Sequence, residues 1–305
     1  MGYKRAGFEV IGNVELDKSA NAAYVKNLNP KYNFCMDLRD FNQIESLPAE
    51  LYELDILDGS PPCTTFSTLG KREAHWGKAK KFREGQKLQT LDDLFFVFLE
   101  TVKKLRPKIV IAENVKGLIQ GNAKGYVNQI LREFKKLDYD VQMFQLNAAF
   151  MDVPQVRERI FFIANNQHFP PLQLNFNNPV IPFKAVRSDS GVEIKNGLMK
   201  KRLEYMLPTD TMIANIILRV ENRWSCFGSK IFQDDRVAAT LTSTGSFIRA
   251  YDKMRLSRED IVNISTFPQD YDFDKAPVRY LCAMSVPPNM TANIVTEIYR
   301  QWLSR

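Results

Sequence analysis

Short apolar segments alternate with helical segments through the first half of this chain, and this alternation limits the fold more than any other feature of the sequence. It is the pattern of a mostly parallel sheet covered by helices on both faces. We therefore expect an α/β fold with a Rossmann-like domain. Strands are expected at residues 8–15, 54–60, 108–114, 140–148 and 159–165, and helices at 19–28, 91–105 and about 123–136.

The alternation ends near residue 167. From there to about residue 254 the sequence contains proline-bounded pieces and polar turns, as in the stretch QHFPPLQLNFNNPVIPF, which is typical of irregular β structure. Helical patterns return at 255–267 and 287–303. We predict a large domain made of residues 1–166 with 279–305, and a smaller, irregular, β-containing domain with a hinge at residues 167–278.

Positive charge is concentrated in one part of the sequence. The 305 residues carry a net charge of +7, and segment 71–87, KREAHWGKAKKFREGQK, holds seven Lys or Arg residues against Glu73 and Glu84. Such a segment favours an anionic partner, although a solvated charged helix has the same composition. The sequence has no run of about 18 apolar residues and no signal-peptide core, so we expect an intracellular, cytoplasmic protein without a membrane partner.

Cys63 lies in the loop SPPCTTFS, residues 60–67, behind two prolines. The four cysteines are far apart and form no CxxC pair, so zinc-ligand spacing is missing and no metal site is expected. A lone cysteine is most often structural. Here, however, Cys63 is followed in order by IAENVKGL, VPQVRERIFFIA, a segment with RVAATLT, and SVPPNMTANI.

With this ordered set the chain resembles the cytosine-C5 methyltransferases, chiefly those that act on DNA, over nearly its whole length outside the variable region. The resemblance implies methyl transfer to carbon 5 of a cytosine in double-stranded DNA, by a monomer of the kind found in prokaryotic or phage restriction-modification systems. The matching elements are Pro62-Cys63, Glu113-Asn114-Val115, Gln155-Val156-Arg157-Glu158-Arg159, the variable region from 167 to about 254, and Val286-Pro287.

The resemblance also implies four catalytic residues. Carbon 5 of cytosine is a poor nucleophile, and addition of the Cys63 thiolate to carbon 6 would make the ring electron-rich through a covalent intermediate. Positive charge from Arg157 would favour that thiolate. Glu113 would serve ring nitrogen 3 with a protonated carboxyl, and Arg159 would hold the neighbouring oxygen.

The methyl donor implied by the resemblance is S-adenosyl-L-methionine. Glu15, which closes the first predicted strand, has the position of an acid that binds the ribose hydroxyls. Asp37 matches the acid near the adenine amino group, although an acid after a strand is often only a turn residue. Further cofactor contacts match Leu38, Pro62, Leu94, Ser285 and Val286.

A base inside a duplex cannot reach a thiol, so the target cytosine would have to be flipped out of the stack. The basic segment 71–87 suits a grip on the phosphate backbone. The variable region is expected to recognise the DNA target sequence, because six of its basic residues are available to phosphates or guanine edges. These are Lys184, Arg187, Lys195, Lys200, Lys201 and Arg202.

Two departures from the family pattern leave alternatives open. The chain begins at a segment that resembles the helix beyond the usual glycine-rich cofactor turn, which predicts a longer reading frame or, alternatively, a catalytically inactive DNA-binding relic. Ala283-Met284 replaces the usual Gly-Asn, which places one cofactor contact in doubt. A third alternative is the branch that methylates transfer RNA, although Cys226-Phe227 is followed by Gly228 where that branch has Thr. A cofactor-binding titration separates the relic from the enzyme.

Overall fold

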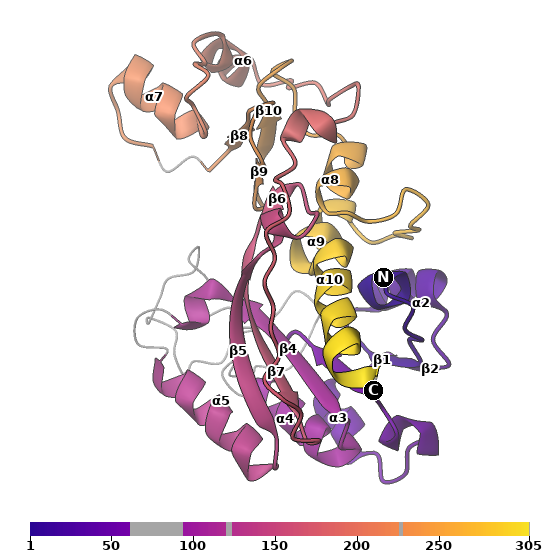
Figure 1. Ribbon diagram of the computed structural model, residues 1–305. Helices are drawn as coiled ribbons and strands as arrows, with labels where there is room; N and C mark the ends of the chain where they lie inside the picture. The colour runs from indigo at the N-terminus through magenta and orange to yellow at the C-terminus, as the bar shows by residue number, and fades with distance from the viewer. Residues whose placement is uncertain (62–93, 120–123, 226–227, 305) are drawn as a thin grey trace.

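The computed structural model describes residues 1–61, 94–119, 124–225 and 228–304 (Figure 1). Its central element is a four-stranded sheet in the order β3-β4-β7-β5. Strands β3 (Ile56–Gly59) and β4 (Ile109–Val115) are parallel, whereas β7 (Glu158–Asn165) runs antiparallel to both β4 and β5 (Asp140–Asn147). Three of these four strands therefore point the same way, and the expected α/β fold with a mostly parallel sheet is confirmed.

Helices cover both faces of this sheet. On one face, α4 (Leu94–Leu105) and α5 (Lys124–Lys136) pack with Val110 and Phe162. On the other face, α10 (Pro288–Ile298) packs with Ile111 and Phe161. Neighbouring residues of β4 thus serve opposite cores, as the two-residue period of a strand requires. Because β4 is buried on both faces, it places whatever follows its carboxyl end at a rigid position.

A separate parallel pair, β1 (Gly12–Val14) with β2 (Tyr32–Phe34), accompanies the main sheet. The strand expected at residues 8–15 is therefore shorter than its apolar pattern suggested. Helix α2 (Lys18–Leu28) follows β1, and its N-cap Asp17 accepts hydrogen bonds from the amides of Ser19 and Ala20. Helix α3 (Leu38–Gln43) follows β2 in the same way, and a 3₁₀ turn covers Ala49–Tyr52.

The N-terminal helix α1 (Gly2–Arg5) packs on α10 at the other end of the chain. The approach is close at Gly2, where an added Cβ would lie 2.4 Å from Thr291 Cβ. Helix α10 continues into a π-helical turn, Tyr299–Leu303, whose Trp302 indole nitrogen donates to the Pro170 carbonyl. The two ends of the chain therefore pack together over one face of the sheet.

The segment from the 3₁₀ turn at Phe183–Ala185 to β10 forms the upper part of the molecule in Figure 1, and it is called the upper region below. It holds the expected short strands, β8 (Lys230–Phe232), β9 (Ala238–Ala239) and β10 (Phe247–Arg249). It also contains two helices that the sequence reading did not predict, α6 (Gly197–Glu204) and α7 (Ile213–Glu221). Strand β9 pairs with β6 (Gln155–Val156), which joins this region to the end of the main sheet.

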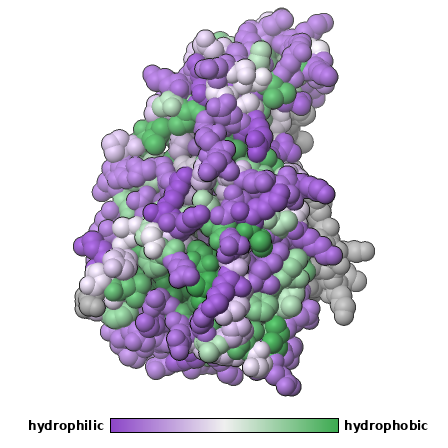
Figure 2. All heavy atoms as spheres, turned by 90° about the vertical axis from the view of Figure 1, so that its right-hand side faces the viewer, coloured by the Kyte–Doolittle hydropathy of each residue, from purple (hydrophilic) through white to green (hydrophobic). Residues whose placement is uncertain are grey.

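Two further helices lie between the upper region and the sheet, α8 (Arg258–Ile264) and α9 (Val278–Met284). Figure 2 shows the side of the molecule on the right of Figure 1, where hydrophilic side chains dominate and hydrophobic ones gather mainly over the lower half. In the described part of the chain, no helix has both the length and the apolar character needed to cross a membrane.

Candidate active site

The nucleophile candidate Cys63 and its neighbour Pro62 lie outside the described residues, as does the basic segment 71–87. The described part of the candidate site lies at the carboxyl ends of β3 and β4, where the loop that leads to Cys63 begins. Asn114 at the end of β4 donates from Nδ2 to the Pro61 carbonyl at 3.2 Å. Its Oδ1 accepts from the amide of Val115 at 2.9 Å. The Glu-Asn-Val element therefore holds the start of the Pro-Cys loop.

Glu113 and Arg159 form an ion pair, with Arg159 Nε 2.8 Å from Glu113 Oε1. Their side chains are only 11% and 14% exposed, so the pair is largely shielded from water. The sheet register explains their meeting, because Glu113 is opposite Phe161 and Arg159 is two residues from Phe161 on the same strand. Burial lowers the pKa of Arg159, and the charge of Glu113 counteracts this shift.

Arg157 is almost completely buried, at 2% exposure. Its Nη2 donates to the carbonyl of Ala283 at 2.9 Å, whereas its Nε and Nη1 have no hydrogen-bond partner among the described residues. Burial lowers the pKa of Arg157 to about 9; the charge of Arg159 lowers it further and that of Glu113 raises it. The side chain is still a cation at neutral pH. A buried cation with two open donors is suited to hold an anionic group.

A small cavity of about 20 Å³ adjoins Glu113. Asp58 from β3, Tyr3 from α1, and Val286 and Thr291 near the start of α10 also line it. The predicted cofactor contact Val286 is thus brought next to the predicted catalytic Glu113. Sequence reasoning missed Asp58 and Tyr3. The sequence signal for Asp58 is an acid inside an otherwise apolar strand, LDILDG.

The two acids expected on the cofactor side lie just after neighbouring parallel strands. Glu15 follows β1, and its Oε1 accepts from the amide of Asp17 at 2.7 Å. Asp37 caps α3 after β2 and accepts from the amide of Arg39 at 2.9 Å. Acids at adjacent strand ends are the residue type that accepts hydrogen bonds from the hydroxyl and amino groups of a nucleoside.

The remaining cofactor candidates are dispersed through the fold. Leu38 is the first residue of α3 and Leu94 the first of α4. Ser285 caps the end of α9 and donates from Oγ to the Leu281 carbonyl at 2.7 Å. No described contact tests their roles toward a cofactor. Among the described residues, no group of three His, Cys, Asp or Glu side chains converges as a metal site would.

Three of the six basic residues expected to contact DNA form ion pairs within the protein. Lys200 pairs with Glu193 at 2.7 Å, and Arg202 pairs with Glu221 at 2.5 Å. Arg187 pairs with Asp234 at 3.1 Å, and its guanidinium lies 4.1 Å from the centre of the Tyr251 ring. Of these three pairs, only the Lys200–Glu193 pair is well exposed, so a phosphate group could replace that carboxylate at small cost. Arg202 and Arg187 are only 11% and 20% exposed and are held within the protein by their pairs.

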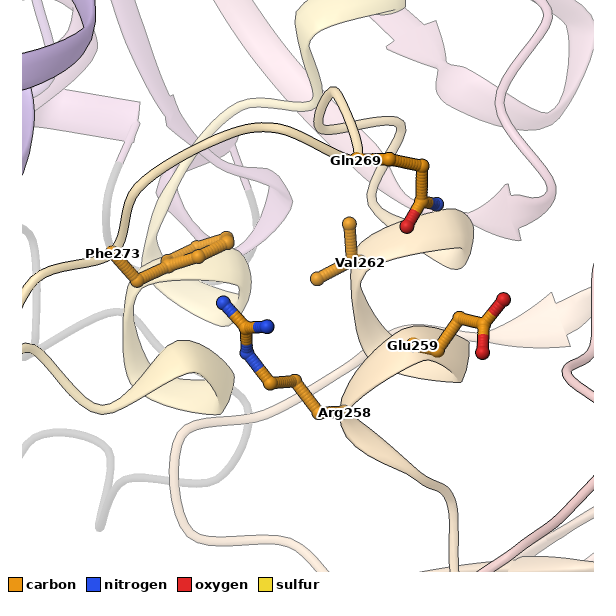
Figure 3. Close-up of a pocket in the computed structure, with 5 residues that line it drawn as sticks. All are labelled: Arg258, Glu259, Val262, Gln269 and Phe273. Carbon is orange, nitrogen blue, oxygen red and sulfur yellow. The ribbon is translucent and has the colours of Figure 1, made fainter.

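A cavity of about 250 Å³ lies elsewhere, on α8 and the segment after it (Figure 3). Arg258 points toward the ring of Phe273, with its guanidinium 5.5 Å from the ring centre, and Glu259, Val262 and Gln269 complete the lining. None of these five residues belongs to the candidate site.

The family model of the C-5 cytosine-specific DNA methylases matches residues 1–300. An orphan methyltransferase, M.SPRI of Bacillus phage SPR, is 34% identical over 160 residues, which are 52% of this chain and 32% of that protein. The type II methyltransferase M.FnuDI of Fusobacterium nucleatum is 31% identical over 187 residues, 60% of this chain and 46% of its own. The chain thus spans less than half the length of these relatives.

Solved structures resemble the whole fold. A putative DNA modification methyltransferase encoded within an Escherichia coli prophage has a TM-score of 0.68 at 20% identity, covering 100% of this chain and 95% of that one. A DNMT2 mutant from Spodoptera frugiperda has a TM-score of 0.63 at 15% identity, with 98% and 95% covered. At these identities the likeness describes the fold alone.

Proposed function

The chain belongs to the C-5 cytosine-specific DNA methylase family, and from this premise we propose that it is a DNA (cytosine-5-)-methyltransferase. The observation that carries the proposal is the arrangement at the end of β4. There Asn114 binds the start of the Pro-Cys loop, while Glu113 is paired with Arg159. This arrangement supports a site in which a thiol, an acid and a cation act on one base.

Cys63 is the proposed nucleophile. Its thiolate adds to carbon 6 of the cytosine, which forms the carbon–sulfur bond and pushes electron density toward nitrogen 3 and the neighbouring oxygen. S-adenosyl-L-methionine would supply the methyl group as a sulfonium, and Glu15 and Asp37 are the residues proposed to hold its ribose and adenine. Solvent water then takes the carbon 5 proton, the double bond between carbons 5 and 6 re-forms, and the carbon–sulfur bond breaks to release the Cys63 thiolate.

The described side chains would stabilise the charge that develops on the ring. Glu113 donates a proton toward nitrogen 3, and Arg159 holds the neighbouring oxygen. Arg157 has two buried donors that lack partners among the described residues, and it is the proposed counter-charge for the thiolate. Low water content at these buried groups strengthens each of these interactions.

Double-stranded DNA is the proposed substrate, with the target cytosine flipped out of the helix. The basic segment 71–87 would contact the phosphate backbone, and residues 167–278 would form the target-recognition domain with its hinge. The large catalytic domain would comprise residues 1–166 with 279–305. A restriction-modification role fits the type II methyltransferases among the relatives.

A covalent trap tests this function. A duplex with 5-fluorocytosine at the target, incubated with S-adenosyl-L-methionine, should yield a stable adduct at Cys63, because fluorine cannot leave as the ring proton does. Cys63→Ser should abolish both adduct and methyl transfer while DNA binding remains. Cys35→Ser, at an exposed position, is the matched control and should behave as the wild type. Adduct formation at another cysteine, or turnover by Cys63→Ser, contradicts the proposal; trapping on transfer RNA alone would reassign the substrate.

A further inference from the structure

Asp58, Glu113 and Arg159 form a diagonal row across three strands. Asp58 on β3 is opposite Ile111 on β4, and Glu113 lies two residues further along β4, on the same face as Ile111. Glu113 is opposite Phe161 on β7, and Arg159 shares the face of Phe161. Glu113 therefore has a cation on one side and a second carboxyl on the other.

The cavity of about 20 Å³ lies next to these two carboxyls, and both line it. A water molecule needs roughly 10–15 Å³ of such space and at least two polar partners. The Tyr3 hydroxyl lines the same cavity and is buried; it makes no hydrogen bond of good geometry within the described residues, although the Asp58 carboxyl lies close enough to accept one from it. Because buried polar atoms are nearly always hydrogen-bonded, one water shared by Tyr3, Asp58 and Glu113 satisfies all three groups.

Asp58 is exposed to water at the end of β3, although protein groups lie around it on several sides. The titratable groups around it come from every element packed nearby: Tyr3 and the amino group of Met1 from α1, Tyr24 from α2, and Glu113 from β4. Helix α10 contributes the uncharged Thr291. The surrounding protein and the like charge of Glu113 raise the pKa of Asp58 to about 7, opposed by the Met1 amino group and Tyr3.

The proposed reaction gives Glu113 two conflicting tasks. Its ion pair with Arg159 favours the ionised carboxylate, yet donation toward nitrogen 3 requires a proton on the same group. We propose that Asp58 stores this proton and passes it through the cavity to Glu113, so that the two carboxyls hold one proton between them. This inference rests on the proposed function.

The transfer balances within the site. As the Cys63 thiolate adds to the ring, the Asp58 acid gives its proton to the cavity water, the water gives one to Glu113, and Glu113 protonates nitrogen 3. When the thiolate leaves, the proton returns by the same path, and Asp58 is again the acid. Asp58 does not touch the substrate, so it is a positioning residue that acts through Glu113.

The test compares pH profiles of Asp58→Asn and the wild type. Single-turnover methylation, and release of tritium from carbon 5 of labelled cytosine, are measured from about pH 5.5 to about pH 8.5. Groups that titrate alike in both proteins, including the nucleophile, change both rates equally. Their effect therefore cancels in the ratio of variant rate to wild-type rate. We expect a loss of about tenfold or more at pH 8, with the ratio recovering by about tenfold per pH unit below pH 7.

Two further variants keep the test decisive. Asp55→Asn changes the same chemical group three residues away, at an exposed carboxylate paired with Lys108, and should leave the ratio near one at every pH. Tyr3→Phe removes only the hydroxyl that would hold the water, and should give a smaller loss of methylation rate with the same pH trend. This variant provides the test if Asp58→Asn fails to fold.

The outcomes separate the two proposals. A wild type that neither methylates DNA nor releases tritium refutes the proposed function. An active wild type with an Asp58→Asn ratio that is the same at every pH refutes the proton store, because a purely structural role would lower the rate uniformly.

Discussion

Replacing Asp260 by alanine should destabilise the protein severely, because this carboxylate joins the upper region to α8. Asp260 is fully buried and accepts hydrogen bonds from the Ser188 amide at 2.7 Å and the Ser257 amide at 2.8 Å. It also lies 3.2 Å from Nη1 of Arg249, whose side chain is itself fully buried. The Ser188 hydroxyl bridges the two, at 3.0 Å from Asp260 and 3.1 Å from Arg249.

The magnitude follows from what the substitution leaves behind. Removing one partner of a buried ion pair costs about 3–5 kcal/mol, since the other charge stays buried. Here Arg249 retains Asp252, with 2.9 Å between Nη2 and Oδ2, which places the loss toward the lower end. Loss of the hydrogen bond from the Ser257 amide, which is the Asp260 half of the capping box, adds about 1 kcal/mol. We therefore expect about 4 kcal/mol, or a fall in Tm of about 8 °C at about 2 °C per kcal/mol.

Thermal unfolding followed by circular dichroism measures this change. Glu259→Ala is the matched control, since it removes an exposed carboxylate from the same first turn of α8 and should change stability by no more than about 1 kcal/mol. The double variant with Arg249→Met should lose less than the sum of the single losses, because the two side chains interact. A loss below about 1 kcal/mol for Asp260→Ala, or strict additivity in the double variant, refutes this reasoning.

Two other predictions use simpler measurements. Burial raises the pKa of the Cys282 thiol to about 12, so a thiol reagent at about pH 8 should label the exposed Cys35 and leave Cys282 unmodified until the protein is denatured; mass spectrometry of the native protein decides this. Alanine at Lys78, Lys80, Lys81 and Arg83 together should weaken binding to all duplexes alike and flatten the slope of log affinity against log salt, whereas altered target preference at an unchanged slope would make them base readers.

Local signals predicted the elements of the main sheet closely. The strand expected at 108–114 is β4 at Ile109–Val115, because an apolar run after Arg106-Pro107 leaves little choice. Asp17 caps α2, and an Asp just before a helical pattern is a strong N-cap signal. Both signals act within a few residues, so sequence alone is sufficient to read them.

Helices α6 and α7 were missed for two different reasons. Helix α7 buries Ile213, Ile216 and Ile217, which is a clear helical spacing, but its short length and the polar turns around it favoured irregular β structure. Helix α6 buries only Met199 and Leu203, so its periodicity is weak. Helix α6 is stabilised by packing against α7, and no local pattern in the sequence predicts this packing.

The meeting of Glu113 with Arg159 has no local signal. The two residues are brought together by the antiparallel pairing of β4 with β7, and the alternation of strands and helices predicts parallel neighbours instead. The family resemblance grouped them by role, but their 2.8 Å contact depends on the register. Asp58 belongs to none of the matched family motifs, so only the pairing of β3 with β4 shows that it lies beside Glu113.

The segment at residues 155–159 connects β9 to the candidate site. Gln155 pairs with Ala238 on β9, and its Oε1 accepts from the Leu241 amide at 3.2 Å. Thr240 donates from its hydroxyl to the Val156 carbonyl at 2.5 Å. The next residue is Arg157, whose guanidinium binds the Ala283 carbonyl of α9. The pairing with β9 is therefore only one peptide unit away from the buried cation, and the same short segment continues to Arg159 and its ion pair with Glu113.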